Sequence, residues 1–327
     1  MSLAVVALLA LGAAALVVWA VREYARRRQE VLRVVTHNLL SDAHLDNFAR
    51  DVEAANQRAR ELGAVPPFAA GAAVELDRAT YAWERRAARI AVDLGAAWLD
   101  ADVQCLQEVT STAELPAAEH FDHALARHAD DANDLAVVRW RRSRFRICGE
   151  PAHLHMGRKK PAVLVCLEAV DAEPAPWRRL VVLNLHHPGG AAATTDGEMA
   201  ALMSAASAAA GAEDAAWIVA GDFNCVGDGA PAAFLRRRGF REAGDAGPPL
   251  PGTFFADAYG LRGAKVDHIF YRPPPGEGGV RASGAVLGAH LDAVDVELLA
   301  GRRPGRGPLA ISDHRAVAME LRVEPVV

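Results

Sequence analysis

Apolar residues occur along this chain in short runs that end in polar residues. The run at residues 216–220 is followed by Gly221, Asp222, Phe223 and Asn224, and its continuous hydrophobicity is typical of a strand buried on both faces. In an extended chain Asp222 and Asn224 point to the same side, and Phe223 points into the core. The carboxyl end of such a strand opens onto loops, where polar side chains can meet a ligand. Taken alone, the segment is as compatible with a purely structural strand followed by an Asp/Asn turn as with a functional site.

The same pattern predicts strands along most of the chain. We expect them at residues 31–40, 102–109, 135–140, 145–148, 162–170, 180–187, 265–272 and 316–321. The three strands between residues 135 and 170 follow one another without a long helix, so we expect them to form a meander.

Helical periodicity is clearest at residues 78–99. The apolar positions at spacings of three and four are Trp83, Ala87, Ile90, Leu94 and Trp98. This helix lies between the first two strands, which predicts a right-handed crossover or a helix packed on a sheet face. Further helices are expected at 196–210 and 231–238, and residues 46–62 (helical spacing) and 66–73 (loop-like) are expected to form an insertion after the first strand.

The first 28 residues differ from the rest. Residues 3–20 form an uncharged run of 18 residues, just long enough to cross a bilayer, and four arginines follow it by residue 28. Positive charge behind the run favours a single-pass membrane anchor at 1–28 with the domain at 29–327 facing the cytoplasm. The alternative is a cleaved signal peptide and secretion, for which the small residues around Trp19 and Ala20 argue.

Composition indicates a folded and slightly acidic protein. The chain has 327 residues, 51% hydrophobic and 24% charged, with a net charge of −5. Disorder is therefore not expected, and the charge gives no general attraction to nucleic acid. A polyanion would have to meet local basic clusters, which occur at residues 141–146, 158–160 and 236–238.

The four cysteines, Cys105, Cys148, Cys166 and Cys225, have none of the short spacings of a zinc or redox site. Each lies in or beside an apolar run. We expect buried free thiols, which are typical of a reducing compartment.

Polar residues that end or interrupt apolar runs are the candidates for chemistry. They are Asn38, Glu108, His186, Asp222, Asn224, Asp267, Asp313 and His314. A structural core disfavours such residues. If they converge, they form a carboxylate-rich pocket with two imidazoles, which suits Mg²⁺ or Mn²⁺ rather than zinc.

Six short motifs carry a resemblance to a known family. In order they are Thr-His-Asn-Leu-Leu, Leu-Gln-Glu-Val, Asn-Leu-His, Gly-Asp-Phe-Asn, Val-Asp-His-Ile-Phe and Ser-Asp-His. Their order and separations resemble the endonuclease/exonuclease/phosphatase superfamily, which has the fold of deoxyribonuclease I, over residues 31–321. The segment from Trp83 to Arg86 most resembles the nocturnin and deadenylase branch. The resemblance implies a four-layered α/β sandwich, with two packed mixed sheets between helices, and Mg²⁺-dependent hydrolysis of a phosphate ester.

The resemblance also implies a metal site. Glu108 would bind the metal, helped by Asn38 and Asp313. In some relatives an acidic residue lies two positions after the asparagine that corresponds to Asn38. This chain has Leu40 at that position. The number of metal ions, one or two, therefore stays open.

Catalytic roles follow from the same resemblance. Asp222 would orient or deprotonate the attacking water, and Asn224 would hold that water and the phosphate. His314 would stabilise charge on the phosphoryl oxygens, held in place by Asp267. His186 would bind the same phosphate from another side.

Three functions are compatible with these residues. The first is a phosphodiesterase or nuclease tethered to a membrane, which is expected to act as a monomer. The second acts on a lipid or inositol phosphate headgroup, and a membrane anchor favours it because tethering raises the local substrate concentration. The third is a catalytically inactive scaffold, against which the presence of Glu108, Asp222 and His314 argues.

Overall fold

The computed structural model describes residues 30–44, 57, 60, 61, 82–157, 160–171, 177–188, 196–211, 214–225, 229–245, 250, 253, 265–275, 280–287, 314 and 316–323. The expected anchor at 1–28, the loop at 66–73, most of 46–62 and Asp313 lie outside this set. In the described ranges no helix is long and apolar enough to cross a bilayer.

The first sheet has six strands in the order β12-β13-β1-β2-β4-β3. Their bounds are β1 Val31–Asn38, β2 Val103–Val109, β3 Phe121–Arg127, β4 Leu135–Arg141, β12 Val280–Val286 and β13 Val317–Val323. β1 and β2 pair in parallel, and the other neighbours are antiparallel. The parallel pair is the one that the expected crossover predicts, because the helix α3 lies between β1 and β2 in the chain.

The second sheet has the order β10-β11-β9-β8-β7-β5, and β6 also pairs with β7. The bounds are β5 Phe145–Ile147, β6 Ala152–Met156, β7 Lys160–Ala169, β8 Arg179–His186, β9 Ala216–Asp222, β10 Arg241–Glu242 and β11 Asp267–Arg272. Here β8 and β9 are parallel and the other pairs are antiparallel. Both sheets are therefore mixed, as expected.

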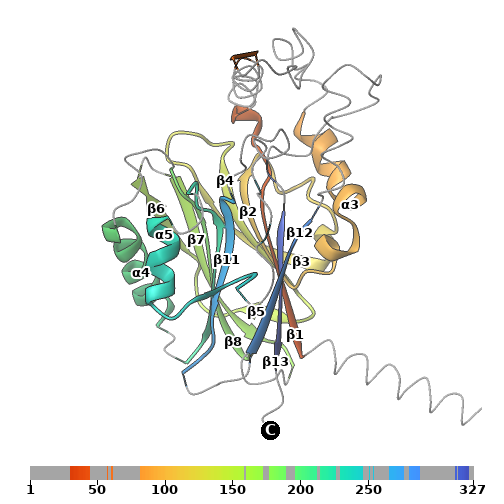
Figure 1. The fold of residues 1–327 in the computed structure, drawn as a ribbon. Helices are drawn as coiled ribbons and strands as arrows, with labels where there is room; N and C mark the ends of the chain where they lie inside the picture. Colours follow the sequence, from red (N-terminus) through yellow and green to blue (C-terminus); the bar gives the residue numbers. More distant parts are fainter. Residues whose placement is uncertain are drawn as a thin grey trace, which may run out of the picture.

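The two sheets pack face to face, with helices on their outer faces (Figure 1). Leu32 and Val34 of the first sheet share a core cluster with Val182 and Ile218 of the second. α3 (Trp83–Leu99) packs on the outside of the first sheet, and α4 (Asp196–Ala210) and α5 (Ala230–Arg237) pack on the outside of the second. Burial of apolar side chains on both faces explains why the central strands are almost continuously hydrophobic.

The amphipathic face predicted for the helix at 78–99 is the buried one. Trp83, Ala87, Ile90, Leu94 and Trp98 are each at most 8% exposed. They share a cluster with residues of β1, β2 and β4, so this helix closes the outer face of the first sheet.

The predicted meander is wrong. The strand expected at 135–140 is β4 of the first sheet, whereas those expected at 145–148 and 162–170 are β5 and β7 of the second. The chain changes sheets between Arg141 and Phe145, because Phe145 turns into the core between the two sheets.

The cysteine prediction is correct only in part. All four are free, as expected, but Cys148 is exposed and Cys166 and Cys225 are only partly buried. Cys105 alone among them is fully buried, and burial raises the pKa of its thiol strongly.

A buried amide pair links the two sheets near the carboxyl ends of β2 and β8. Gln107 of β2 donates from Nε2 to Oδ1 of Asn184 on β8 at 2.6 Å. Asn184 Nδ2 in turn donates to the carbonyl oxygens of Leu106 and Val137 at 2.8 and 3.0 Å. Because both amides are fully buried, these bonds fix how one sheet sits on the other.

Candidate active site

Strand register brings the polar strand ends to one end of the sandwich. Asn38 is the last residue of β1, and His186 and Asp222 are the last residues of the parallel strands β8 and β9, where they pair directly. β11 runs the other way, so its first residue, Asp267, pairs with Asp222. Strand pairing therefore brings His186, Asp222 and Asp267 together at this end of the sandwich.

Glu108 reaches the same place through an irregularity in β2. The pairing of β2 with β4 shifts between Leu106 and Val109, and Glu108 has a φ of 52°. A bulge with one residue in the left-handed region re-aims a side chain that a regular strand would point elsewhere. The carboxylate then accepts hydrogen bonds from Asn38 Nδ2 at 3.2 Å and from the backbone N–H of Ser41 at 3.3 Å.

Asp222 lies at the centre of the site and is 1% exposed. Its Oδ2 accepts a hydrogen bond from Asn38 Nδ2 at 3.0 Å, and its Oδ1 accepts one from the backbone N–H of Asn224 at 2.7 Å. Each carboxylate oxygen therefore has a fixed donor. The orientation of the carboxylate is set before any ligand arrives.

Asn224 follows the strand in a left-handed conformation with a φ of 45°. The backbone at Asn224 is therefore not extended, but the Asn224 side chain still lies beside Asp222, and Phe223 turns into the core and is fully buried, as expected. Asn224 Nδ2 donates to the carbonyl oxygen of His187 at 2.8 Å and lies 3.3 Å from Asp222 Oδ2. The turn ties the ends of β8 and β9 together around the carboxylate.

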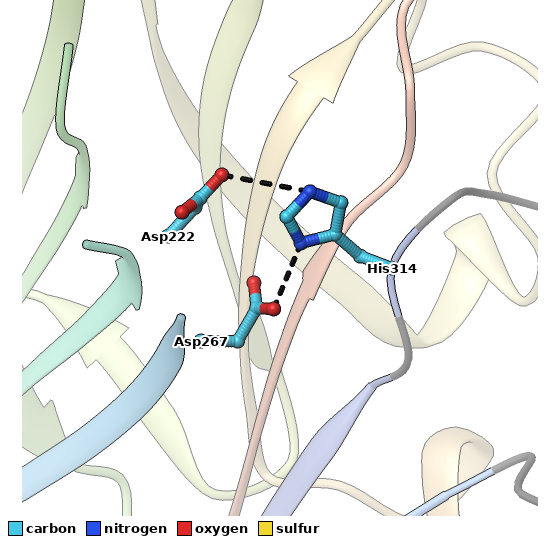
Figure 2. Close-up of side chains that lie close together, drawn as sticks. All are labelled: Asp222, Asp267 and His314. Atoms are coloured by element: carbon cyan, nitrogen blue, oxygen red, sulfur yellow. Dashed lines mark hydrogen bonds and ion pairs between the residues drawn. The ribbon is translucent and has the colours of Figure 1, made fainter. Parts of the chain in front are cut away.

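His314 is held by Asp267, as the resemblance implies. The two side chains join through His314 Nδ1 and Asp267 Oδ2 at 2.8 Å, which leaves Nε2 facing Asp222 Oδ2 at 3.8 Å (Figure 2). A second contact, which the sequence did not suggest, runs from His37 Nε2 to the backbone oxygen of His314 at 3.1 Å. His37 is the buried neighbour of Asn38 on β1, and a lone buried histidine gives no signal of a positioning role.

His186 lies between the two acidic groups. Its Nε2 is 3.6 Å from Glu108 Oε1 and 3.7 Å from Asp222 Oδ2. Burial, together with the positive charge of Lys160, lowers the pKa of His186 well below its ordinary value, so the ring is neutral at neutral pH. A neutral imidazole can still donate one hydrogen bond to a phosphoryl oxygen.

Burial has the opposite effect on Asp222. It raises the pKa of this carboxyl to about 7, and Asp267 adds to the rise, while His314 and Asn38 oppose it. A carboxyl with a pKa near neutrality is suited to accept a proton from water.

The donor set fits a hard divalent cation. Atoms of Asp222, Asp267 and His314 all lie within 4.8 Å of one another, and Oδ1 of Asp267 is buried without a hydrogen-bond partner. Glu108 adds a further carboxylate close to Asp222, because Asn38 Nδ2 donates a hydrogen bond to each of them. Carboxylate oxygens are the ligands that Mg²⁺ and Mn²⁺ prefer. Asp313, also expected to bind the metal, lies outside the described residues.

Hydrolysis of a phosphate ester requires a group that takes a proton from water and fixed groups that stabilise charge on the phosphoryl oxygens. The fold and the site together define such a hydrolase. A family model described as endonuclease/exonuclease/phosphatase matches residues 35–314, and the chain belongs to this family. None of the curated proteins matches the chain.

Solved structures share the fold over nearly the whole chain. The catalytic domain of human nocturnin with bound sulfate has a TM-score of 0.57 at 15% identity and covers 90% of this chain and 95% of its own. A mannosyl-6-phosphatase of Bacteroides thetaiotaomicron has a TM-score of 0.57 at 18% identity, with 89% and 99% covered. ANGEL2, a 2′,3′-cyclic phosphatase in complex with adenosine-2′,3′-vanadate, has 0.58 at 15% identity, with 90% and 96% covered.

Proposed function

We propose that this chain is a Mg²⁺-dependent phosphodiesterase in which Asp222 activates the attacking water. The observation that carries the proposal is the environment of that carboxylate. It is buried, oriented by Asn38 and Asn224, and faces the imidazole of His314, which Asp267 holds. A base, a hydrogen-bond donor and a set of metal-binding oxygens then surround one point.

Each residue has one task in this scheme. Asp222 takes a proton from water as the water attacks phosphorus, while Asn224 keeps the carboxylate turned toward that water. His314, oriented through Nδ1 by Asp267, presents Nε2 to the phosphoryl oxygens, and His186 contacts them from the side of Glu108. Glu108, with Asn38, would hold a divalent cation that neutralises charge on the phosphate and helps to position it.

The nature of the ester is the open part of this proposal. The structural neighbours include a mannosyl-6-phosphatase and a 2′,3′-cyclic phosphatase in complex with adenosine-2′,3′-vanadate, so the fold accommodates several esters. We favour a phosphodiester of a nucleotide or nucleic acid, and a lipid or inositol phosphate headgroup is the alternative.

The test is hydrolysis of bis(p-nitrophenyl) phosphate by the purified full chain in detergent. Turnover is expected with Mg²⁺ or Mn²⁺ and is expected to disappear with a chelator. A panel of RNA, DNA, sphingomyelin and inositol phosphates would then identify the natural ester. Turnover that persists with chelator, or a protein inactive on the whole panel under all metals, would contradict the proposal.

We further propose that residues 3–20 anchor the enzyme in a membrane with the catalytic domain in the cytoplasm. The uncharged run and the arginines behind it support this orientation. Carbonate extraction of membranes should leave the full-length protein in the pellet. Recovery of full-length protein in the supernatant would remove the anchor, and recovery of a shortened protein outside the cell would favour a cleaved signal peptide.

A further inference from the structure

Three side chains beside the active site form a cluster that the proposed chemistry does not use. Lys160 Nζ donates to Asp134 Oδ2 at 3.0 Å, and His44 Nε2 lies 3.3 Å from the same oxygen. The Asp134 side chain is 1% exposed, whereas those of Lys160 and His44 are 16% and 23% exposed. A buried carboxylate thus holds two nitrogen groups that both reach solvent.

Strand register places this cluster next to the catalytic groups. β7 is antiparallel to β8 with Ala162 opposite Leu185, so Lys160, two residues earlier, lies beside the chain just past His186. Asp134 directly precedes Leu135, whose partner on β2 is Val109, the residue after Glu108.

His44 approaches from the third side. It ends the short 3-10 helix η1 (Asp42–His44), which directly follows Ser41, and the N–H of Ser41 binds Glu108. The three members of the cluster therefore come from three separate segments and meet at the side of the site formed by Glu108 and His186.

The charges of the cluster act on the catalytic site. Burial alone would raise the pKa of Asp134, but its hydrogen bond with His44 and the positive charge of Lys160 lower it, so the group is a carboxylate at neutral pH. The bond to Asp134 raises the pKa of His44 in spite of partial burial. With His44 protonated the cluster carries one net positive charge.

Other basic residues are committed elsewhere. Arg144 binds Asp102 at 2.7 Å and the carbonyl oxygen of Val31, at the opposite end of β1 from Asn38. Arg146 of β5 pairs with Glu168 of β7 at 2.9 Å. Glu168 lies near the end of β7, whereas Lys160 is the first residue of that strand. Lys160, in contrast, lies beside the chain just past His186, and its side chain is partly exposed to solvent.

We propose that Lys160 and His44, held by Asp134, form a subsite for a second phosphate of the substrate, next to the ester that is cut. The inference rests on the proposed function, because it takes the scissile phosphate to lie between Glu108, His186 and Asp222. A phosphate one linkage away on the Glu108 and His186 side would meet the ammonium of Lys160, which has three donor hydrogens and gives one to Asp134, and the imidazole of His44 would add positive charge beside it. The subsite selects esters that carry two anionic groups over those that carry one.

The experiment compares two esters that differ only in the second phosphate. Thymidine 5′-(p-nitrophenyl phosphate) and its 3′-phosphorylated form release the same chromophore. The wild-type chain should show a kcat/KM for the second ester about tenfold higher, since a hydrogen bond to a charged group has roughly this effect. Lys160→Met should bring the ratio of the two kcat/KM values close to one, and Lys160→Arg should restore most of it.

Arg146→Met is the matched control, because it removes a cation of the same sheet that pairs with Glu168, and it should keep the wild-type ratio. Thermal unfolding of each variant checks that the protein is folded, and a ratio is insensitive to a uniform loss of active enzyme. A wild-type ratio near one, or a wild-type ratio retained in Lys160→Met, would overturn the subsite.

Binding separates this inference from the proposed function. Calorimetry with Ca²⁺ in place of Mg²⁺ compares thymidine 3′,5′-bisphosphate with thymidine 5′-monophosphate on the wild type and on Lys160→Met. If neither ester is hydrolysed, the proposed function fails, and the ratio of the two dissociation constants still decides the subsite. Tighter binding of the bisphosphate that Lys160→Met abolishes supports it, and equal binding of both nucleotides overturns it.

Discussion

Asn38 Nδ2 donates a hydrogen bond of 3.0 Å to Asp222 Oδ2, and the two residues belong to different sheets. The carboxylate proposed as the base is therefore oriented by a residue of the opposite layer. The same amide contacts Glu108, which lies in the same sheet as Asn38. The active site exists only when the two sheets are packed in one relative position, and the buried Gln107–Asn184 pair helps to fix that position.

Loss of either central group should abolish turnover. Asp222→Ala removes the base and His314→Ala removes the imidazole that faces it, and each is expected to lower kcat on bis(p-nitrophenyl) phosphate at least about a hundredfold. Asp214→Ala is a suitable control, because Asp214 is an exposed aspartate paired with Arg179 on the surface. Near-normal rates in a folded Asp222→Ala or His314→Ala protein would refute the roles assigned to them.

The raised pKa of Asp222 has a consequence for the stability of the metal-free protein. The pKa of this carboxyl is 3.8 in the unfolded chain and about 7 in the folded protein. The group therefore contributes stability that is fully present below the unfolded pKa and is lost as the pH rises through about 7. With chelator present, the wild type should therefore lose free energy of unfolding relative to Asp222→Asn between pH 5 and pH 8. The loss should be at least about 1 kcal/mol, because one pKa unit corresponds to about 1.4 kcal/mol.

Urea unfolding of both proteins at the two pH values measures this difference. Addition of Mg²⁺ at pH 8 should stabilise the wild type more than Asp222→Asn, since a cation bound by the folded state adds to its stability. Parallel pH profiles for the two proteins in chelator would show that Asp222 titrates normally.

Arg86 should control how well the site holds its metal. Its guanidinium is fully buried and donates to the carbonyl oxygen of Leu39 at 2.5 Å and to Asp42 at 2.7 Å. These contacts fix the loop whose Ser41 N–H binds Glu108. Arg86→Met is expected to raise the Mg²⁺ concentration for half-maximal activity and to lower the free energy of unfolding by about 2 to 4 kcal/mol, as loss of a buried charged partner does.

Arg85→Met provides the matched control, because Arg85 is exposed on the same turn of α3. Arg85→Met should change the free energy of unfolding by no more than about 0.5 kcal/mol. The Mg²⁺ concentration for half-maximal activity should change by no more than the factor that corresponds to this energy. If Arg86→Met lowers stability but leaves the Mg²⁺ dependence unchanged, the contact holds the helix and not the metal site.

The sequence predicted the interior of the fold better than its edges. The strands with continuous apolar runs, such as β8 and β9, were located within a few residues, because burial on both faces leaves a strong signal. The strands that were missed, β3, β6, β10 and β12, all lie at or beside sheet edges. In β12 buried and exposed residues alternate with glycine and serine among them, so neither propensity nor hydrophobicity marks it as a strand.

The candidate site was predictable as a set of residues but not as a geometry. Polar residues at strand ends identified Glu108 and Asp222, yet nothing in their spacing shows that one lies in each sheet. The bulge that turns Glu108 and the left-handed turn at Asn224 are local backbone features without a sequence signature of their own. The cluster of His44, Asp134 and Lys160 joins segments that are 90 and 26 residues apart, a contact that only the fold brings about.

Gly221 should be the least replaceable glycine near the site. It precedes Asp222 with a φ of 144°, and a Cβ at this position would lie 1.9 Å from the backbone oxygen of Leu185 on β8. That contact is between two backbones in the centre of a sheet, so neither strand can move aside without disturbing His186 or Asp222. Gly221→Ala is expected to lower the free energy of unfolding by more than about 3 kcal/mol or to prevent folding.

Gly211 offers the comparison, because it also has a positive φ, 54°, but a Cβ there would meet no atom within 4 Å. Gly211→Ala should therefore cost only the backbone strain of about 1 to 2 kcal/mol. Thermal and urea unfolding of the two variants separate the effect of close strand approach from that of the left-handed conformation. Equal destabilisation by both would mean that β8 and β9 can move apart, and the fixed spacing of His186 and Asp222 would then not be a property of the sheet.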